Sequence, residues 1–119
     1  MSRDIKFRAW NKVTKTMYNS AIYNCKDSFD MILKHPQIYD VMQYTGLNDK
    51  NDVEIYEGDI LEYRSSKEWG IGEIIWDISR LSFAINFVKP NIEDALLFYF
   101  QCKDEIEVTG NMYENSEKV

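Results

Sequence analysis

The sequence has few of the residues on which metal sites, disulfides and catalytic relays depend. It contains one His and two Cys among 119 residues. A structural zinc site usually needs four Cys or His ligands at close spacing, so we expect no metal bound through these groups. Cys25 and Cys102 are far apart in the sequence, which favours two reduced thiols, with a disulfide or a redox role as the alternative. His35 stands beside Pro36, where we expect a surface or helix-capping role rather than catalysis.

Proline, glycine and long apolar runs are also scarce. Two Pro, five Gly and 45% hydrophobic residues exclude collagen-like, low-complexity and wholly disordered chains. The longest apolar run, residues 95–100, is far shorter than the ~20 residues of a membrane-spanning helix. The first residues are charged, so we expect no signal peptide. We therefore expect one cytoplasmic domain that folds alone and binds no membrane.

Basic residues are outnumbered, with 14 Lys and Arg against 20 Asp and Glu and a net charge of −6. This balance opposes general nucleic-acid binding, because non-specific affinity comes from neutralising phosphates. The first fifteen residues are an exception, since they hold five basic residues and one acidic residue. Nucleic-acid binding through this segment, with an aromatic ring stacked on a base, is therefore the second hypothesis. Its residues are Arg3, Lys6, Arg8, Trp10, Lys12 and Lys15.

Alternating polar and apolar residues predict a mainly β chain. In residues 4–9, Ile5, Phe7 and Ala9 share one face and the charged residues occupy a solvated face. A polar turn at residues 11–16 then leads to a hairpin partner. The further extended segments that we expect are 17–23, 38–44, 53–56, 59–64, 71–77, 81–88, 97–100 and 105–108, with 92–97 open to helix or strand.

Two local signals interrupt the strands. Asp27 or Ser28 is expected to cap a short helix that ends near His35, because the proline that follows disfavours helical geometry before it. Gly46 is expected to open a long polar turn at residues 48–52.

Aromatic residues are plentiful, and most are expected in the core because they supply large buried areas on strands. A few tyrosines instead suit a groove for a peptide or for bases. The predicted core set is Trp69, Trp76, Phe83, Phe87, Phe98, Tyr99 and Phe100, and the predicted groove set is Tyr56, Tyr63 and Tyr113.

Carboxylates gather between residues 49 and 59. Aligning an EF-hand loop at Asp49 places Glu54 where Gly is required and Ile60 where the bidentate Glu belongs. We expect a solvated turn, with a cation site as the alternative. The acidic residues of this segment are Asp49, Asp52, Glu54, Glu57 and Asp59. The third hypothesis is a metal-dependent nuclease, for which the Asp4-Ile5-Lys6 triplet is the local signal and Asp49, Asp52 and Asp59 are the residues to mutate.

Three segments carry a family resemblance. They are RDIKFRAWNK at residues 3–12, QYTGLNDKN with EIYEGDI at residues 43–51 and 54–60, and EVTGNMYEN at residues 107–115. Together they resemble the YopX family of phage and prophage proteins. The resemblance implies an SH3-like barrel, an origin in phages or prophages of Gram-positive bacteria, and expression in the cytoplasm of an infected host. It implies no cofactor, and no catalytic residue can be carried over.

The recurring residues of that family have structural explanations. Gly46 and Gly58 permit backbone conformations that a side chain opposes. Glu57 and Asp59 are expected to accept backbone N–H groups that fix a turn, and Tyr56 and Tyr113 to cover a barrel end. The residues expected to build the terminal turn are Gly110, Asn111 and Asn115.

These observations predict a single domain over residues 1–119. An N-terminal hairpin, a helix and a polar turn occupy residues 1–57 and pack on an SH3-like barrel at 58–115, followed by a frayed tail at 116–119. The leading functional hypothesis is a non-enzymatic module that binds a host or phage macromolecule, with a protein favoured over nucleic acid. An exposed strand edge leaves self-association open.

Overall fold

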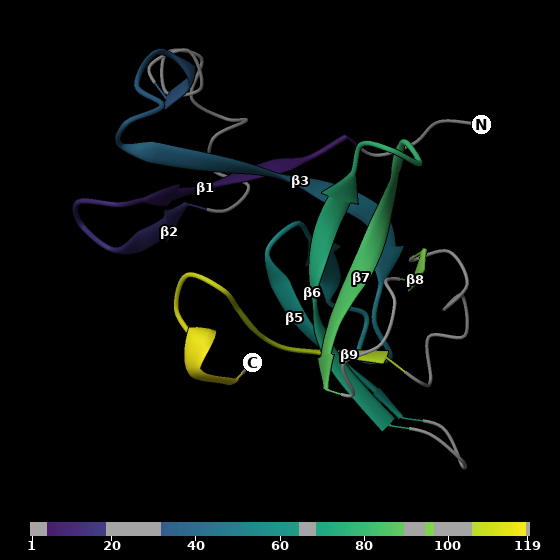
Figure 1. The fold of residues 1–119 in the computed structure, drawn as a ribbon. Helices are drawn as coiled ribbons and strands as arrows, with labels where there is room; N and C mark the ends of the chain where they lie inside the picture. Colours follow the sequence, from purple (N-terminus) through teal and green to yellow (C-terminus); the bar gives the residue numbers. More distant parts are fainter. Residues whose placement is uncertain (1–4, 19–31, 65–68, 90–94, 97–105, 119) are drawn as a thin grey trace. The chain divides into compact units, whose positions relative to one another are not determined.

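The computed structural model describes residues 5–18, 32–64, 69–89, 95–96 and 106–118. In these residues the chain is mainly β and forms two antiparallel sheets, so the predicted fold class is confirmed (Figure 1). The elements are β1 (Phe7–Asn11), β2 (Thr16–Tyr18), β3 (Tyr39–Asn48), β4 (Glu54–Tyr56), β5 (Asp59–Arg64), β6 (Trp69–Asp77), β7 (Ser82–Lys89), β8 (Ala95–Leu96), β9 (Ile106–Asn111) and a 3-10 turn, η4 (Ser116–Lys118).

The chain divides into two compact units, unit 1 (Met1–Tyr44) and unit 2 (Thr45–Val119), and the division falls inside β3. The single domain and the boundary after residue 57 that the sequence predicts stay predictions, as does the packing of the hairpin on the barrel. The tail that we expected to be frayed begins with the 3-10 turn η4.

Unit 1 contains an antiparallel sheet built on β1, which lies between β2 and β3. Asn11 ends β1, and its Oδ1 accepts hydrogen bonds from the backbone amides of Val13 at 2.9 Å and Thr14 at 3.0 Å. A side chain that binds amides two and three residues ahead is a common way to start a turn. The predicted polar turn and hairpin are therefore confirmed.

The predicted two-faced pattern of β1 is wrong for Arg8. The strand is buried at Arg8, Ala9, Trp10 and Asn11 alike, whereas we expected the arginine on a solvated face. Arg8 Nε donates to Met42 Sδ at 3.4 Å, and the two residues are register partners in β1 and β3. A central strand that is covered on both faces need not alternate with a period of two.

The helix predicted before Pro36 lies mostly outside the described residues. Residues 32–34 are helical, and the amide of His35 donates to the carbonyl of Ile32 at 3.2 Å. The helix ends where the proline requires it to end. The two cysteines and the aromatic residues 98–100 also lie outside the described residues.

The polar turn predicted at residues 48–52 begins one residue later than expected, because β3 extends beyond the predicted segment 38–44. β3 continues through Gly46, which has a φ of +89°, and ends at Asn48. A left-handed glycine inside a strand accommodates an irregularity without steric cost. The turn between β3 and β4, which we call the β3–β4 turn, is therefore confined to residues 49–53.

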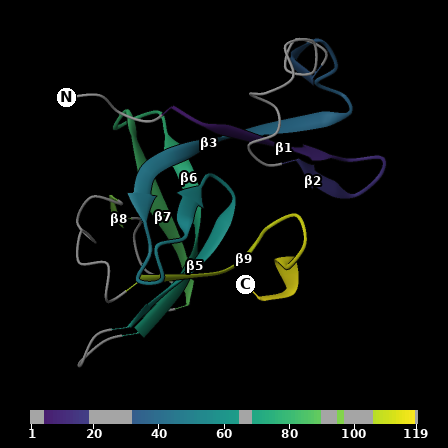
Figure 2. The same ribbon diagram turned by 180° about the vertical axis from the view of Figure 1, so that it is seen from behind.

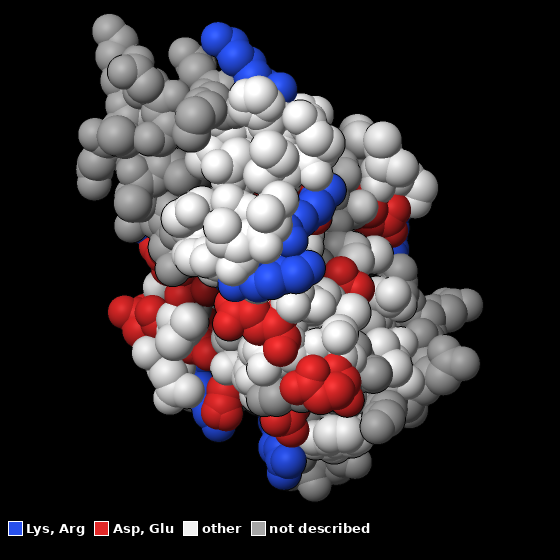
Figure 3. All heavy atoms as spheres, turned by 90° about the vertical axis from the view of Figure 1, so that its left-hand side faces the viewer, with Lys and Arg blue, Asp and Glu red and all other residues white. Residues whose placement is uncertain are grey.

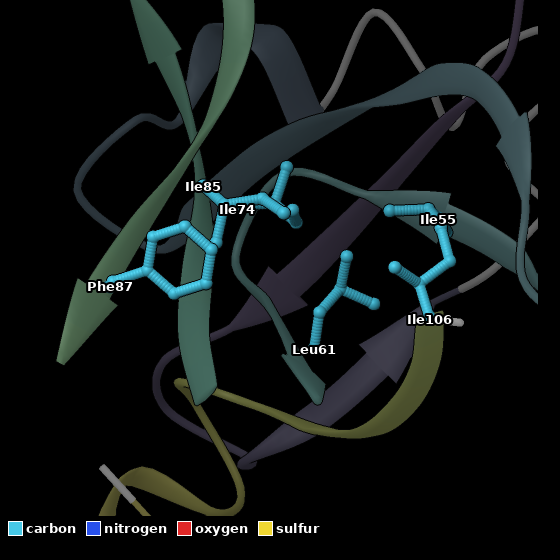
Figure 4. Close-up of a cluster of buried hydrophobic side chains, with 6 residues drawn as sticks. All are labelled: Ile55, Leu61, Ile74, Ile85, Phe87 and Ile106. Carbon is cyan, nitrogen blue, oxygen red and sulfur yellow. The ribbon is translucent and has the colours of Figure 1, made fainter. Parts of the chain in front are cut away.

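Unit 2 contains a curled sheet in the order β8-β7-β6-β5-β9. The central strands are visible from both sides in Figures 1 and 2. Five strands contribute side chains to one buried cluster, and these side chains point toward one another in Figure 4. Burying such aliphatic and aromatic side chains stabilises the fold by about 1.5–3 kcal/mol each. The cluster consists of Ile55, Leu61, Ile74, Ile85, Phe87 and Ile106.

Strand positions in unit 2 follow the sequence closely. β5 has the predicted bounds, and β6 begins two residues earlier than predicted, at Trp69. β7 covers residues 82–89, so Leu81 lies in the turn before it rather than in the strand. Phe87 is buried and Phe83 packs against the core, as predicted. Trp69 and Trp76 are 43% and 45% exposed, so their assignment to the core is wrong.

Candidate binding surface

An apolar strip extends from the core of unit 2 along the β6–β7 hairpin. Cross-strand partners on the core face are Ile74 with Ile85 and, one step further along, Trp76 with Phe83. The rings of Trp76 and Phe83 meet edge to face, with their centroids 5.0 Å apart. Phe83 is partly buried against the core, whereas nearly half of Trp76 is exposed. The face that forms the core therefore continues outward onto the surface.

The turn at the end of this hairpin adds two exposed aliphatic side chains. Ile78 is 78% exposed and Leu81 is 73% exposed, and both lie in the turn at residues 78–81. Leu81 has a φ of +50°, a left-handed backbone conformation that is energetically unfavourable for a residue with a Cβ. We call Trp76, Ile78, Leu81 and Phe83 the hairpin strip.

Asp77 fixes the geometry of this turn, which we call the β6–β7 turn. Its Oδ1 accepts hydrogen bonds from the hydroxyl and the amide of Ser79, at 2.6 and 3.0 Å. Its Oδ2 accepts from Arg80 Nε at 2.6 Å. The side-chain hydrogen bonds from Ser79 and then Arg80 lower the pKa of Asp77 to about 2. The turn is therefore held by local polar contacts.

Two carboxylates that we expected in a solvated turn are buried. The Oδ1 atom of Asp49 accepts the amides of Asn51 and Val53 at 2.8 and 2.9 Å, and its Oδ2 accepts the amide of Val108 at 2.8 Å. Asp59 Oδ2 accepts the amide of Tyr56 at 2.8 Å. The solvated-turn prediction is wrong for these two residues, because both side chains are buried and accept backbone N–H groups.

Metal coordination was the alternative for this acidic segment. Asp52 is exposed and binds Asn48 Nδ2 at 2.9 Å. Across the residues that the structure describes, no group of three or more His, Cys, Asp or Glu is placed to hold a metal ion. The cation site and the nuclease stay predictions.

The residues proposed for nucleic-acid binding lie in unit 1, and several have protein partners. Lys6 Nζ lies 5.6 Å from the centre of the Tyr44 ring, and Lys12 Nζ lies 3.3 Å from Asp40 Oδ1. Arg8 and Trp10 are buried. Lys15 is exposed at the hairpin turn, and Arg3 lies outside the described residues. The buried side chains are not available to phosphates or bases in this arrangement.

The predicted terminal turn is present in unit 2. Asn111 Oδ1 accepts the amides of Tyr113 and Glu114 at 3.0 and 2.9 Å, and Asn115 Oδ1 accepts the amide of Asn111 at 3.3 Å. A side chain at Gly110 would collide with Asn115, whose Oδ1 lies 2.6 Å from the position of a Cβ. The side chains of Asn111 and Asn115, and the lack of one at Gly110, therefore shape this turn.

The tyrosines expected to line a groove are only partly accessible. Tyr56 is buried, with its hydroxyl 3.2 Å from Glu54 Oε1, and Tyr63 packs against the core. Tyr113 is half-buried. Gly58 has a φ of +84°, as its predicted place in a turn requires, and Glu57 beside it is half-buried. The binding role assigned to these tyrosines stays a prediction.

The elements described above define a small antiparallel β protein with a curled, barrel-like sheet. A family model described as "YopX protein" matches residues 6–119. The chain therefore belongs to the YopX family, as the sequence motifs indicated. Among the described residues, no helix is long and apolar enough to cross a membrane.

The solved structures that resemble this chain include one that aligns over nearly all of it. It is the crystal structure of protein EF1440 from Enterococcus faecalis. The two chains are 26% identical and align with a TM-score of 0.64 over 98% of this chain and 99% of the other. No curated protein matches the chain. These comparisons support the fold and the family and assign no activity.

Proposed function

We propose that this chain is a non-enzymatic binding module that recognises a macromolecule in the cytoplasm of a phage-infected cell. The phage setting comes from the family resemblance. The observation that supports a binding role is the exposure of the hairpin strip in unit 2. Tryptophan is enriched among the residues that dominate protein interfaces, and exposed aliphatic side chains beside it enlarge the apolar area.

The two buried carboxylates support a non-enzymatic reading of the acidic segment. Asp49 and Asp59 both accept backbone amides inside unit 2. These hydrogen bonds stabilise the turns next to Asp49 and Asp59. They also occupy carboxylate oxygens that a metal or a substrate would need. The acidic segment therefore has a structural role that accounts for its composition.

Two tryptophans of β6 provide the test. Trp76 and Trp69 are similarly exposed, but period-two alternation places them on opposite faces of the strand. Trp69 Nε1 donates to Glu62 Oε1 at 3.1 Å. Wild type, W76A and W69A can be immobilised and exposed to a lysate of cells that carry the gene. We expect wild type and W69A to retain the same macromolecule and W76A to lose it. Identical retention by all three, or no retention by wild type, would refute the proposed function.

The same experiment decides between protein and nucleic acid. The basic residues of unit 1 favour the nucleic-acid alternative, because unit 1 holds seven Lys and Arg against four Asp and Glu. If nuclease treatment releases the retained material and K12A/K15A abolishes retention, unit 1 is the binding region. If the retained material resists nuclease and depends on Trp76, the hairpin strip is the binding region.

A further inference from the structure

One end of unit 1 is basic. The described residues at this end are 11–18, which contain the turn between β1 and β2, and 32–39, which lead into β3. Together these two segments contain three Lys and one His but no Asp or Glu. Unit 2 has the opposite bias, with seven Lys and Arg against sixteen Asp and Glu. We call Lys12, Lys15, Lys34 and His35 the basic end.

Hydrogen bonds hold the two segments of the basic end side by side. The amide of Lys12 donates to the carbonyl of Ile38 at 2.8 Å, and its Nζ donates to the carbonyl of Pro36 at 3.4 Å. The amide of Tyr39 donates to the carbonyl of His35 at 3.1 Å, which folds the second segment back on itself. The β1–β2 turn and the residues before β3 therefore lie at the same end of the sheet.

Two lysines of the basic end are accessible to a ligand. Lys15 and Lys34 are exposed, and neither forms an ion pair with another residue that the structure describes. Lys12 lies 3.3 Å from Asp40 Oδ1, so its charge is partly compensated. Figure 3 is viewed from the side to which the β1–β2 turn points in Figure 1, and blue side chains stand out from a mainly white surface in its upper part. An anion can therefore reach Lys15 and Lys34 without competing with a described carboxylate.

An exposed aromatic ring lies on the same sheet. Tyr18 is the register partner of Ala9. Tyr39 is the partner of Asn11, two residues further along β1, so both tyrosine rings project from one face. The ring centroids are 6.2 Å apart, and Tyr39 packs against the buried cluster of unit 1. Tyr39 therefore supports one side of Tyr18, which stays 37% exposed. The sequence assigned base stacking to Trp10, which is buried, and the structure offers Tyr18 in its place.

Lysines beside an exposed ring favour one class of ligand. Lysine side chains are flexible point charges that suit a phosphate backbone, and an aromatic ring stacks on the open face of any base. In a duplex these faces are covered by neighbouring base pairs, so only a single strand offers them to the ring. The carboxylates of an acidic polypeptide are attracted to the lysines but repelled by the electronegative face of the ring.

The acidic balance of the whole chain opposes this binding at long range. The net charge of −6 repels phosphates. At about 0.1 M salt, however, exposed charges that are separated by more than ~10 Å are largely screened. The charges close to the ligand therefore decide whether it binds, and at the basic end these charges are lysines.

We propose that the basic end of unit 1 binds single-stranded nucleic acid, with Lys15 and Lys34 contacting phosphates and the ring of Tyr18 stacking on a base. The proposal goes beyond the function proposed above, because it assigns a second ligand to a surface in the other unit. The binding shows little dependence on base sequence, because contacts to phosphates carry no sequence information and stacking tolerates every base.

The salt dependence of oligonucleotide binding tests the lysines. The probes are labelled oligothymidylate and oligouridylate of about 10 nucleotides, and fluorescence anisotropy measures their binding to the full chain. For single strands, the logarithm of the binding constant falls with the logarithm of the salt concentration, with a slope of about −0.7 for each neutralised phosphate. We expect a slope of about −1.4 to −2 for wild type and of about −0.7 or weaker for K15Q/K34Q.

Substitutions of Tyr18 test the ring separately from the charges. Y18A should weaken binding at least about fivefold without changing the slope, because stacking does not release counterions. Y18F is its control, since it keeps the ring and should bind like wild type.

K50Q/R64Q is the matched charge control. It removes two positive charges from unit 2, where these residues pair with Glu107 and Glu62. It should change the binding constant by less than about twofold, since it leaves the basic end intact. W76A should also bind the oligonucleotides like wild type, because the hairpin strip is not part of this surface.

The contrary results separate this proposal from the function proposed above. No anisotropy change at low salt, the same slope for K15Q/K34Q and wild type, full binding by Y18A, or an equal loss in K50Q/R64Q would each overturn the basic end as the site. Equal affinity for a duplex, or equally effective competition by polyglutamate, would overturn single-stranded nucleic acid as the ligand. None of these results affects the role of the hairpin strip. Loss of oligonucleotide binding in W76A would instead place nucleic acid on the strip and overturn the present proposal alone.

Discussion

Two hairpin turns of unit 2 begin with an aspartate, and the two aspartates serve different ends. In the β3–β4 turn, Asp49 is fully buried and its second oxygen reaches Val108 of β9, 59 residues away in sequence. In the β6–β7 turn, Asp77 binds only Ser79 and Arg80 among the hydrogen bonds described above. The same local motif therefore fixes a turn to a remote strand in one hairpin and leaves it at the surface in the other.

Within unit 2, the turn that stabilises the fold and the turn that we propose for binding are therefore different. The β3–β4 turn exposes no large apolar cluster and holds a terminal strand in place through a carboxylate. The β6–β7 turn is closed by its own polar residues, so Ile78 and Leu81 contribute little to the core and stay exposed. We therefore expect substitutions in the first turn to affect folding and substitutions in the second to affect binding.

The largest expected effect is on the anchored turn. The substitution D49A removes the acceptor of three backbone amides, those of residues 51, 53 and 108. Leaving such donors unsatisfied costs about 1–3 kcal/mol for each buried group, and water can replace the acceptor only for the exposed ones. We expect the free energy of unfolding, measured with urea, to fall by about 3–5 kcal/mol.

Asp52 provides the control within the same turn. It is exposed and has a φ of +63°, a conformation that asparagine tolerates well. D52N should change the free energy of unfolding by less than about 0.5 kcal/mol. If D49A and D52N destabilise the chain equally, the Asp49 side chain is not the anchor of the turn.

How far the sequence predicts such features depends on how local their causes are. The strand at residues 59–64 and the turn after Asn11 were predictable, because alternation and a turn-forming side chain act over a few residues. The burial of Asp49 was not, because its third partner is an amide of β9. Nothing near residue 49 signals that contact, so an acidic polar segment indicated solvent exposure.

The sequence predicted which strand face carries the candidate surface but not that this surface is exposed. Alternation places Trp76 on the same face as Ile74, which is why it was assigned to the core. The position at which a strand leaves the core depends on which other strands cover it, and that is a tertiary property. Arg8 shows the opposite error, because its place in an alternating pattern predicts exposure, whereas the structure buries it against Met42. At Trp76 and Arg8 alike, tertiary packing and not the period-two alternation of the sequence determines burial.

The second expected effect concerns the rings at the outer end of the core. Edge-to-face aromatic pairs contribute about 0.5–1.5 kcal/mol beyond area burial. In a double-mutant cycle of W76A and F83A, we expect a coupling energy in that range. W76A alone should cost about 1–2 kcal/mol, because nearly half of its side chain is already in water. The chain should stay folded in circular dichroism, and coupling near zero would contradict the ring contact.

A smaller effect, of opposite sign, is expected at the exposed turn. Leu81 adopts a left-handed conformation that costs a residue with a Cβ roughly 1–2 kcal/mol. L81G removes that strain. Glycine also increases the conformational entropy of the unfolded chain, and this cancels roughly 0.5–1 kcal/mol of the stabilisation. We expect thermal unfolding to show a net stabilisation of about 0–1 kcal/mol. L81A is the control, since it keeps the Cβ and the strain, and it should not be more stable than L81G.

The smallest effect concerns the protonation of Asp77. The hydroxyl of Ser79, followed by the guanidinium of Arg80, lowers the pKa of Asp77 from 3.8 to about 2. A carboxyl whose pKa is lower in the folded state stabilises the fold above its unfolded pKa, and this contribution is lost as the pH falls through the folded value. Asp77 should therefore add no pH dependence to stability between about pH 5 and 8 and should act only between about pH 4 and 2. In an NMR titration of the side-chain carboxyl, S79A should raise the pKa more than R80A, and the double variant should return it close to 3.8. A wild-type midpoint near 3.8 would mean that the β6–β7 turn is open in solution. The two turns would then differ in how ordered they are as well as in how deeply their aspartates are buried.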